Sequence, residues 1–246
     1  MPQKGWLCEK TGQPVGFDEC MECAGTPDRC DFTPEILRAI KKNLRMKPTR
    51  RLSVTRLLGE PRQRVIEMKY DYYVSPMKQW PLARGTGLHL LLERAAYHDV
   101  LSEAGNSREI CVDGAWVPVF GVVDVMRFDT HLIRDYKSCA FVPKYDKPYG
   151  NHALQLNVYR WMWMPRCDCY NLHLTYMDSK RIRDMKVEIM SLDEIETLLI
   201  KHATVFLRHM DSNTLPPGKP TKSNWQCRYC DVRPICEREA ERGKGV

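Results

Sequence analysis

Hydrophobic residues recur along this chain with two different periods, and the period of about 3.6 residues predicts five helices. The expected ranges are residue 34 onward, then 53–68, 88–100, 152–164, and residue 191 onward. Thr33 and Pro34 suit the N-cap and the first position of the first helix. Ser191 and Glu194 have the spacing of a capping box at the start of the last helix. Residues 1–32 lack such a period and are expected to be loop-like.

A period of two residues, which is typical of strands, dominates the middle of the chain. Asp113-Gly114 is a strong signal for a hairpin turn between a strand at 109–112 and another that runs from 115 through 124. The second strand is apolar at alternate positions on both faces, so we expect it to be buried on both. Further strands are expected at 171–177 and 185–189. This succession predicts an α/β fold in which helices flank a central mixed sheet.

Two acidic residues are expected to face each other across the next hairpin. If Asp129-Thr130 forms a two-residue turn, Asp124 lies opposite Asp135, and Lys137 lies on the same face as Asp135. The other residues of that face are largely apolar: Val122, Met126, Phe128 and Ile133. Because directly opposed like charges are destabilising, we expect a cation between the carboxylates. A divalent metal with a lysine beside it is the equipment of a nuclease.

The composition allows a sizeable core and argues against a membrane protein. The chain has 246 residues, of which 43% are hydrophobic and 28% charged, enough for one large domain or a core with appendages. No apolar run approaches the roughly 20 residues that cross a bilayer, and no signal peptide is evident, so we expect a cytoplasmic protein. The net charge of +7 and a basic run from Arg45 to Arg64 are compatible with a polyanionic partner. A solvated helix face is the alternative explanation of that run.

The chain carries 11 cysteines, and in a reducing compartment spaced cysteines indicate metal binding before disulfides. Cys227, Cys230 and Cys236 form a C-x2-C-x5-C motif that can hold three corners of a soft-metal site. Four scattered cysteines are expected to be small buried hydrophobic residues: Cys111, Cys139, Cys167 and Cys169.

A second group of cysteines lies near the N-terminus, at Cys8, Cys20, Cys23 and Cys30. Four thiolates suit a closed tetrahedral zinc site, and a segment this short has little core of its own, so a metal would supply its folding energy. As alternatives, these cysteines could contribute ligands to a metal cluster elsewhere in the protein, or they could bind no metal.

The order of the motifs resembles that of the PD-(D/E)XK nuclease superfamily, in particular its RecB-like branch. His89 closes the run Gly85-Thr86-Gly87-Leu88-His89, Asp124 closes Gly121-Val122-Val123-Asp124, and Asp135-Tyr136-Lys137 follows the hairpin. Gln155 and Tyr159 then lie one helical turn apart. The branch includes the iron–sulfur nucleases of CRISPR adaptation and the AddAB-type recombination nucleases. Each motif alone is weak, and their order over about residues 52–240 carries the resemblance.

The resemblance implies a restriction-endonuclease-like core and a role for each of these residues. Asp124 and Asp135 would bind Mg²⁺ or Mn²⁺, with the side chain of His89 and the backbone carbonyl of Tyr136 as further ligands. The metal would activate a water and stabilise charge on the scissile phosphate. Lys137 would orient or deprotonate that water, or offset phosphate charge.

Gln155 and Tyr159 would steady that lysine and contact the DNA backbone. By itself His89 is more typical of a helix surface or a core, and Tyr159 of packing.

The C-terminal cysteine spacing resembles part of the 4Fe–4S site of the iron–sulfur RecB-like nucleases. In that family a fourth cysteine precedes a Pro-Arg pair far upstream, whereas here Glu60 precedes Pro61-Arg62. Glu60 could ligate the fourth iron, an N-terminal cysteine could reach the site, or the site could hold zinc. Either metal would tie the tail to the region near residue 60. Three cysteines without a metal remain the alternative.

These interpretations predict a Mg²⁺- or Mn²⁺-dependent deoxyribonuclease that hydrolyses phosphodiester bonds, most simply an exonuclease on single-stranded or frayed DNA ends. The expected domains are a cysteine-rich segment (1–32), a helical region (33–83), a nuclease core (84–215) and a metal-bound tail (216–246). One alternative is a DNA-binding subunit with a nuclease fold that acts as a partner of CRISPR-adaptation or recombination proteins. Another is a metal-stabilised interaction module in which the carboxylate pair is accidental.

Overall fold

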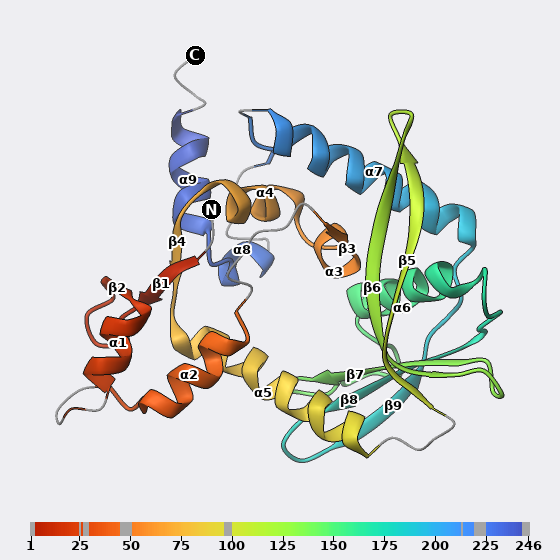
Figure 1. Ribbon diagram of the computed structural model, residues 1–246, viewed down its shortest axis with the longest axis horizontal. Helices are drawn as coiled ribbons and strands as arrows, with labels where there is room; N and C mark the ends of the chain where they lie inside the picture. The colour runs from red at the N-terminus through yellow and green to blue at the C-terminus, as the bar shows by residue number, and fades with distance from the viewer. Residues whose placement is uncertain are drawn as a thin grey trace. The chain divides into compact units, whose positions relative to one another are not determined.

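The computed structural model describes residues 3–24, 26, 30–44, 51–95, 100–212, 214–218 and 225–242 (Figure 1). The chain divides into two compact units. Unit 1 consists of 1–49, 60–83 and 206–246, and unit 2 of 50–59 and 84–205. Unit 1 therefore combines N-terminal, helical and C-terminal segments that are far apart in the sequence.

Unit 2 is built on a mixed sheet of six strands. The strands are β3 (Leu52–Ser53), β5 (Leu101–Val112), β6 (Ala115–Arg127), β7 (Leu132–Ser138), β8 (Asn171–Met177) and β9 (Ile182–Lys186). Their order is β3-β6-β7-β8-β9, and β5 pairs with β6 as a long ribbon (Figure 1). The pairs β3–β6 and β7–β8 are parallel and the others antiparallel. The predicted α/β fold with a mixed central sheet is confirmed.

Helices cover this sheet, and α6 (Gly150–Trp163) contacts four of its strands, β5 to β8. The others are α3 (Val54–Leu57), the C-terminal part of α5 (Pro76–Arg94) and most of α7 (Leu192–Asp211). Asn157 is buried within α6, and its amide donates to the Glu188 carbonyl at 3.0 Å and accepts from the Met190 amide at 2.8 Å. Because these bonds satisfy both ends of its amide, Asn157 can be buried at low cost in free energy.

Both predicted hairpins form, with one correction. Val112 pairs with Ala115 around Asp113-Gly114, and both turn residues have the positive φ angles, 49° and 83°, that such a turn requires. The second hairpin has the predicted register, since Val125 pairs with Arg134, but its connection spans four residues (128–131) rather than two.

Only part of the apolar face of this hairpin is buried. Met126 and Ile133 are fully buried, whereas Val122 and Phe128 are 44% and 47% exposed. Burial on both faces of β6 is therefore confined to part of the strand.

Four predicted element boundaries are wrong. The strand expected at 109–112 is β5, which already begins at Leu101. The helix expected at 88–100 is α5, which begins at Pro76 and ends at Arg94, because proline is well suited to a first helical turn. The helix expected at 53–68 is broken into α3 and α4 (Pro61–Lys69), since Pro61 cannot continue a helix but can begin one. The last strand lies at 182–186 rather than 185–189, because Asp178 accepts two backbone hydrogen bonds at 2.8 Å and tightens the turn before it.

Unit 1 contains a small sheet in the order β2-β1-β4. Its strands are β1 (Gln3–Leu7), β2 (Pro14–Gly16) and β4 (Tyr72–Val74), and its helices, besides α4, are α1 (Phe17–Ala24), α2 (Pro34–Lys42), α8 (Trp225–Tyr229) and α9 (Arg233–Arg242). The expectation of a loop-like N-terminus is wrong because tertiary contacts order it. The rings of Trp6 and Phe17 pack edge to face at 4.7 Å, and the Trp6 indole donates to Gln79 at 3.0 Å.

The predicted helix caps are confirmed. Thr33 accepts from the Ile36 amide at 3.4 Å, and Ser191 and Glu194 form the reciprocal capping-box bonds. No helix among the described residues is long and apolar enough to span a membrane.

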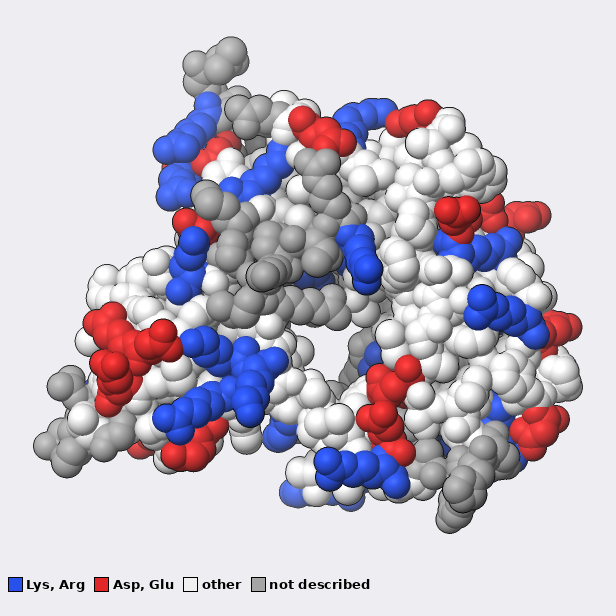
Figure 2. All heavy atoms as spheres, viewed as in Figure 1, with Lys and Arg blue, Asp and Glu red and all other residues white. Residues whose placement is uncertain are grey.

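Charges of both signs lie side by side on unit 1. On the face shown in Figure 2, Lys and Arg side chains gather over α2, and acidic side chains gather over α1. Lys41 of α2 forms an ion pair with Asp18 of α1 at 2.8 Å. This part of the surface is therefore not a purely basic one.

Candidate active site

Three adjacent strands of unit 2 each place an acidic residue at the same level of the sheet. The β5–β6 pairing is continuous on both sides of Glu103 and puts that residue across from Asp124. The β6–β7 ladder ends at the pair Val125–Arg134. Continued by one residue, the same register puts Asp135 across from Asp124. Glu103 has an unusual positive φ of 48°. Three neighbouring carboxylates repel one another unless cations lie between them.

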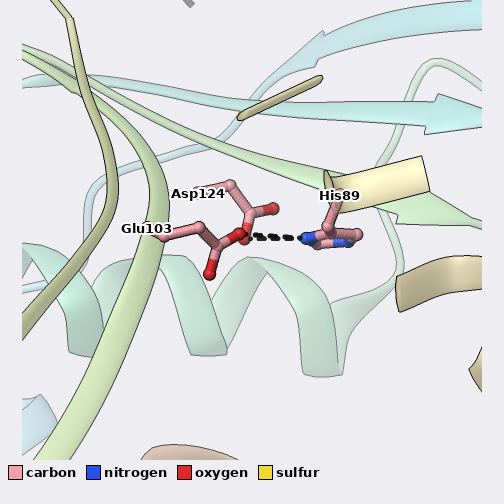
Figure 3. Close-up of side chains that lie close together, drawn as sticks. All are labelled: His89, Glu103 and Asp124. Atoms are coloured by element: carbon pink, nitrogen blue, oxygen red, sulfur yellow. Dashed lines mark ion pairs between the residues drawn. The ribbon is translucent and has the colours of Figure 1, made fainter. Parts of the chain in front are cut away.

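Helix α5 supplies His89 to this row of acidic residues (Figure 3). Its Nδ1 lies 3.2 Å from Oδ1 of Asp124 and 3.5 Å from Oε1 of Glu103. Within the part of the chain that the structure describes, these three residues form the one group whose ligand atoms all lie within 4.8 Å of one another. Glu103 is a new member of the site, while His89 and Asp124 were predicted from the sequence.

The carboxylates and the imidazole perturb one another. The hydrogen bond with Asp124 raises the pKa of His89 to about 9, although burial opposes that shift. Burial and the charge of Asp124 raise the pKa of Glu103. A protonated His89 therefore offsets the negative charge of both carboxylates at neutral pH.

The same side chains line a cavity of about 10 Å³, together with Ser102 and Tyr136. The hydroxyl oxygen of Ser102 is buried and forms no hydrogen bond with the described residues. Such a volume is of the order that holds one water, about 10–15 Å³. An imidazole nitrogen and two carboxylates are ligands that fit a small divalent cation and its water.

A second group of polar side chains extends from β7 to α6. Nζ of Lys137 lies 2.6 Å from Oδ2 of Asp135, as an ion pair, and donates to Oε1 of Gln155 at 2.9 Å. Gln155 in turn donates to the Tyr159 hydroxyl at 2.7 Å. Burial raises the pKa of Asp135, which is 3% exposed, and the adjacent ammonium of Lys137 counteracts the shift. This chain of contacts holds the lysine in one position.

The two groups are joined through the backbone of β7. The amide of Tyr136 donates to Oδ2 of Asp124 at 2.6 Å and thereby orients the carboxylate that His89 contacts through its other oxygen. The carbonyl of Tyr136 and the carboxylate of Asp135 as metal ligands stay predictions, because neither belongs to the three-residue group around His89.

Sequence reasoning missed Glu103 and Ser102, although a signal was present. The Asp113-Gly114 turn predicts a register that, extended back along both strands, pairs the region of Glu103 with that of Asp124. The expected helix to residue 100 and the short strand at 109–112 hid that extension.

The structure brings the C-terminal cysteines and Glu60 together. Cys227, Cys230, Cys236 and Glu60 line one cavity of about 180 Å³ in unit 1. Nε of Arg62 donates to Sγ of Cys236 at 3.1 Å. The C-terminal tail thus lies against the start of α4, and its predicted contact with the region near residue 60 is present.

The N-terminal cysteines Cys8, Cys20, Cys23 and Cys30 line a separate cavity of about 410 Å³. The scattered cysteines differ among themselves. Cys167 and Cys169 are buried as expected, Cys139 is partly buried, and Cys111 is exposed because it lies at an outward-facing position of β5.

Comparison with known proteins agrees with this geometry. The family model of the PD-(D/E)XK nuclease superfamily matches residues 78–237, which is more than half of the chain. The crystal structure of SSO0001 has a TM-score of 0.59 and 21% sequence identity over 82% of this chain and 93% of that chain, a likeness that establishes the fold alone.

A protein from Eubacterium rectale described as a "Putative exonuclease" has a TM-score of 0.39 and 13% identity over 61% of this chain and 60% of that chain, too low to support a conclusion. No curated protein shows a significant match. The family match includes every residue of the two polar groups in unit 2, and the chain belongs to the PD-(D/E)XK nuclease superfamily.

Proposed function

We propose that this nuclease is a Mg²⁺- or Mn²⁺-dependent deoxyribonuclease of the RecB-like branch that degrades DNA from single-stranded or frayed ends. The observation that carries the proposal is the cavity in which His89, Glu103 and Asp124 present three ligand atoms within 4.8 Å of one another. The choice of DNA ends as substrate rests on the order of the sequence motifs.

In this proposal His89, Glu103 and Asp124 hold the cation, with Asp135 and the Tyr136 carbonyl completing its surroundings. When bound, the cation acts as a Lewis acid and lowers the pKa of its water. The Tyr136 amide fixes Asp124, so the carboxylate does not need to reorganise during the reaction.

Lys137 is the residue proposed to act on the attacking water or on the phosphate. Its ammonium is held between Asp135 and Gln155 and retains a third N–H for a substrate oxygen. Gln155 and Tyr159 position the lysine, and in this proposal they also contact the DNA backbone.

For the C-terminal cavity we propose a 4Fe–4S cluster held by Cys227, Cys230, Cys236 and Glu60. Support comes from the convergence of all four residues on one cavity and from the Arg62 guanidinium, which donates a hydrogen bond to Sγ of Cys236. A brown protein with a broad visible absorption band is expected after anaerobic purification. A colourless protein with zinc in this cavity would contradict the cluster.

The basic run divides between several environments. Arg62 donates to Cys236 and to the Pro216 carbonyl, and Arg64 forms an ion pair with Glu67 at 2.9 Å, so both have roles within unit 1. The run is therefore not one uninterrupted phosphate-binding face. Its residues Arg45, Lys47 and Arg50 lie outside the described residues.

The decisive experiment compares Asp124→Asn with the control Asp129→Asn. Asp129 lies on the same hairpin, but its side chain is exposed and forms an ion pair with Arg127. Asp124→Asn should reduce cleavage of end-labelled single-stranded DNA in Mg²⁺ or Mn²⁺ by at least about 100-fold, as the loss of a preorganised electrostatic contact does. Asp129→Asn should retain activity. Equal activity of both variants would contradict the assigned site.

Substrate choice is tested with linear single-stranded, blunt duplex and circular single-stranded DNA. Degradation of the linear single strand with protection of the circle is the expected result, because an exonuclease needs an end. Cleavage of the circle would exclude the exonuclease assignment. Binding of DNA without cleavage by the wild-type protein would favour a DNA-binding subunit that works with CRISPR-adaptation or recombination proteins.

A further inference from the structure

Four cysteines of unit 1 come from three separate places in the fold and meet at one cavity. Cys8 directly follows β1, Cys20 and Cys23 lie on α1, and Cys30 lies in the connection to α2. All four line a cavity of about 410 Å³. The nuclease site proposed above contains none of them and belongs to unit 2.

Local hydrogen bonds hold the backbone on both sides of this cavity. The amide of Cys8 donates to the Gln13 carbonyl at 2.9 Å, and the Gly12 amide donates back to Cys8 at 2.7 Å. Gly12 has a φ of 68°, which glycine adopts at low cost. Across the cavity, the amide and hydroxyl of Thr26 donate to the Cys23 carbonyl at 3.1 and 2.8 Å. Tight turns thus hold the backbone at Cys8 and Cys23.

The surrounding core is small. Among the described residues its buried members are Trp6, Phe17, Cys20, Phe32, Leu37 and Ile40, and partly buried hydrophobic residues pack against them. Small elements with so little buried apolar surface are commonly stabilised by a disulfide or by a structural metal. All four cysteines are free thiols in the structure, which leaves four sulfur ligands on one cavity.

We propose that Cys8, Cys20, Cys23 and Cys30 bind one structural zinc ion. Four thiolates form the closed tetrahedral set that structural zinc prefers, and Cys20 and Cys23 have the C-x2-C spacing that such sites use. The ion ties β1, α1 and the start of α2 together, and its binding free energy adds to the stability of unit 1.

The geometry implies a measurable rearrangement on binding. Zn–S bonds of about 2.3 Å place tetrahedral sulfurs about 3.8 Å apart, whereas no three of these sulfur atoms lie within 4.8 Å of one another. Cys8, Cys23 and Cys30 are partly exposed, so their side chains can rotate toward the buried Cys20. Zinc therefore contracts the cavity and protects all four thiols from alkylation.

The test measures metal content of the full chain, purified with a reductant, for the wild type, Cys23→Ser, Cys23→His and Cys111→Ser. Cys23→Ser should lose about one zinc per chain relative to the wild type. Cys23→His should keep it, because imidazole is also a zinc ligand. Cys111→Ser, an exposed cysteine of β5, is the matched control and should keep it as well.

A second measurement does not depend on the folding of any variant. Cobalt introduced into the wild type should show the strong visible bands of tetrahedral thiolate ligation, and zinc should displace it. Retention of zinc by Cys23→Ser would overturn the proposal. Loss of iron and sulfide in that variant would overturn the proposal in favour of a cluster. Disulfides among these four cysteines that persist in metal-free protein purified with a reductant would also overturn it.

Discussion

At the residue scale, the chain places like charges next to one another where packing alone would disfavour them. Glu103, Asp124 and Asp135 occupy neighbouring strands at one level of the sheet, and each is balanced by a cationic or hydrogen-bonding group. His89 lies against the first two and Lys137 against the third. A divalent cation bound among these side chains would neutralise much of this negative charge.

Glu103→Gln tests whether the residue that sequence reasoning missed holds the cation. Even residues that only support metal ligands cost about 10–100-fold in affinity or activity when replaced. The Mg²⁺ concentration for half-maximal cleavage should therefore rise by at least about 10-fold in this variant. Glu93→Gln is the control, because Glu93 lines the same cavity but does not belong to the three-residue group. An equal shift in both variants would contradict a specific role for Glu103.

At the element scale, α6 matters because its residue Gln155 positions Lys137 of β7. Its approach to β6 is possible only because residue 121 is glycine. A Cβ atom there would lie 2.8 Å from the Tyr159 ring and 3.0 Å from Met162 and Val54 side chains. Tyr159 accepts the hydrogen bond of Gln155, so the packing of this helix is coupled to the lysine.

Gly121→Ala should therefore push α6 away and affect both stability and catalysis. Overpacking of this kind costs about 1–3 kcal/mol, which urea denaturation would measure. The cleavage rate at saturating metal should fall, while the metal dependence stays close to that of the wild type. Gly105→Ala on β5 is the matched control, since a Cβ atom there meets nothing within 4 Å. Equal denaturation midpoints for the two variants would refute close packing at position 121.

His152 on α6 predicts a pH dependence of stability. Burial, and then the charge of Lys137, lowers its pKa from 6.5 to about 4, and its Nδ1 lies 3.1 Å from the Tyr176 hydroxyl. Between these pKa values the unfolded chain binds more protons than the folded one, so this residue makes stability fall as the pH falls from about 6.5 to about 4.

The measurement is the difference in unfolding free energy between the wild type and His152→Asn across that range. Other titrating groups, Asp135 among them, cancel in the difference. The wild type should lose more stability on acidification than the variant does. Parallel pH profiles would show that His152 titrates normally.

At the scale of the whole molecule, unit 1 is assembled from distant parts of the chain. Ile66 of α4 packs against Val232 and Cys236 near α9, while Lys69 donates to the Ser212 carbonyl. Two cysteine-lined cavities belong to this unit. The stability of unit 1 therefore depends on contacts between segments that are far apart in the sequence. The apolar contacts and the proposed metals both hold these segments together.

Ile66→Ala should weaken the packing of α4 against α9. Replacing a fully buried isoleucine with alanine costs about 2–5 kcal/mol, and the loss should appear as faster hydrogen exchange in α9 with little change in β7 and β8. Ile182→Ala, at a position that is 75% exposed, is the control and should leave exchange unchanged. Unaltered exchange in α9 would mean that the tail is held by other contacts.

Local sequence patterns predicted the structural features that are determined by residues close together in the sequence. Turn residues and alternation fixed the pairing of Asp124 with the strand of Asp135, and Ser191 with Glu194 marked the start of α7. Elements whose limits depend on tertiary packing were predicted less well. Trp6 orders an N-terminus that has no period of its own, and Pro61 starts a helix where the pattern suggested continuity.

The sequence by itself therefore determined the α/β class, the hairpin register and the order of the nuclease motifs, because these follow from short-range periodicity and turn chemistry. Only the tertiary structure decided that Glu103 joins His89 and Asp124, and that each cysteine group lines a single cavity. Those outcomes depend on contacts between residues far apart in the chain, which side-chain periodicity does not encode.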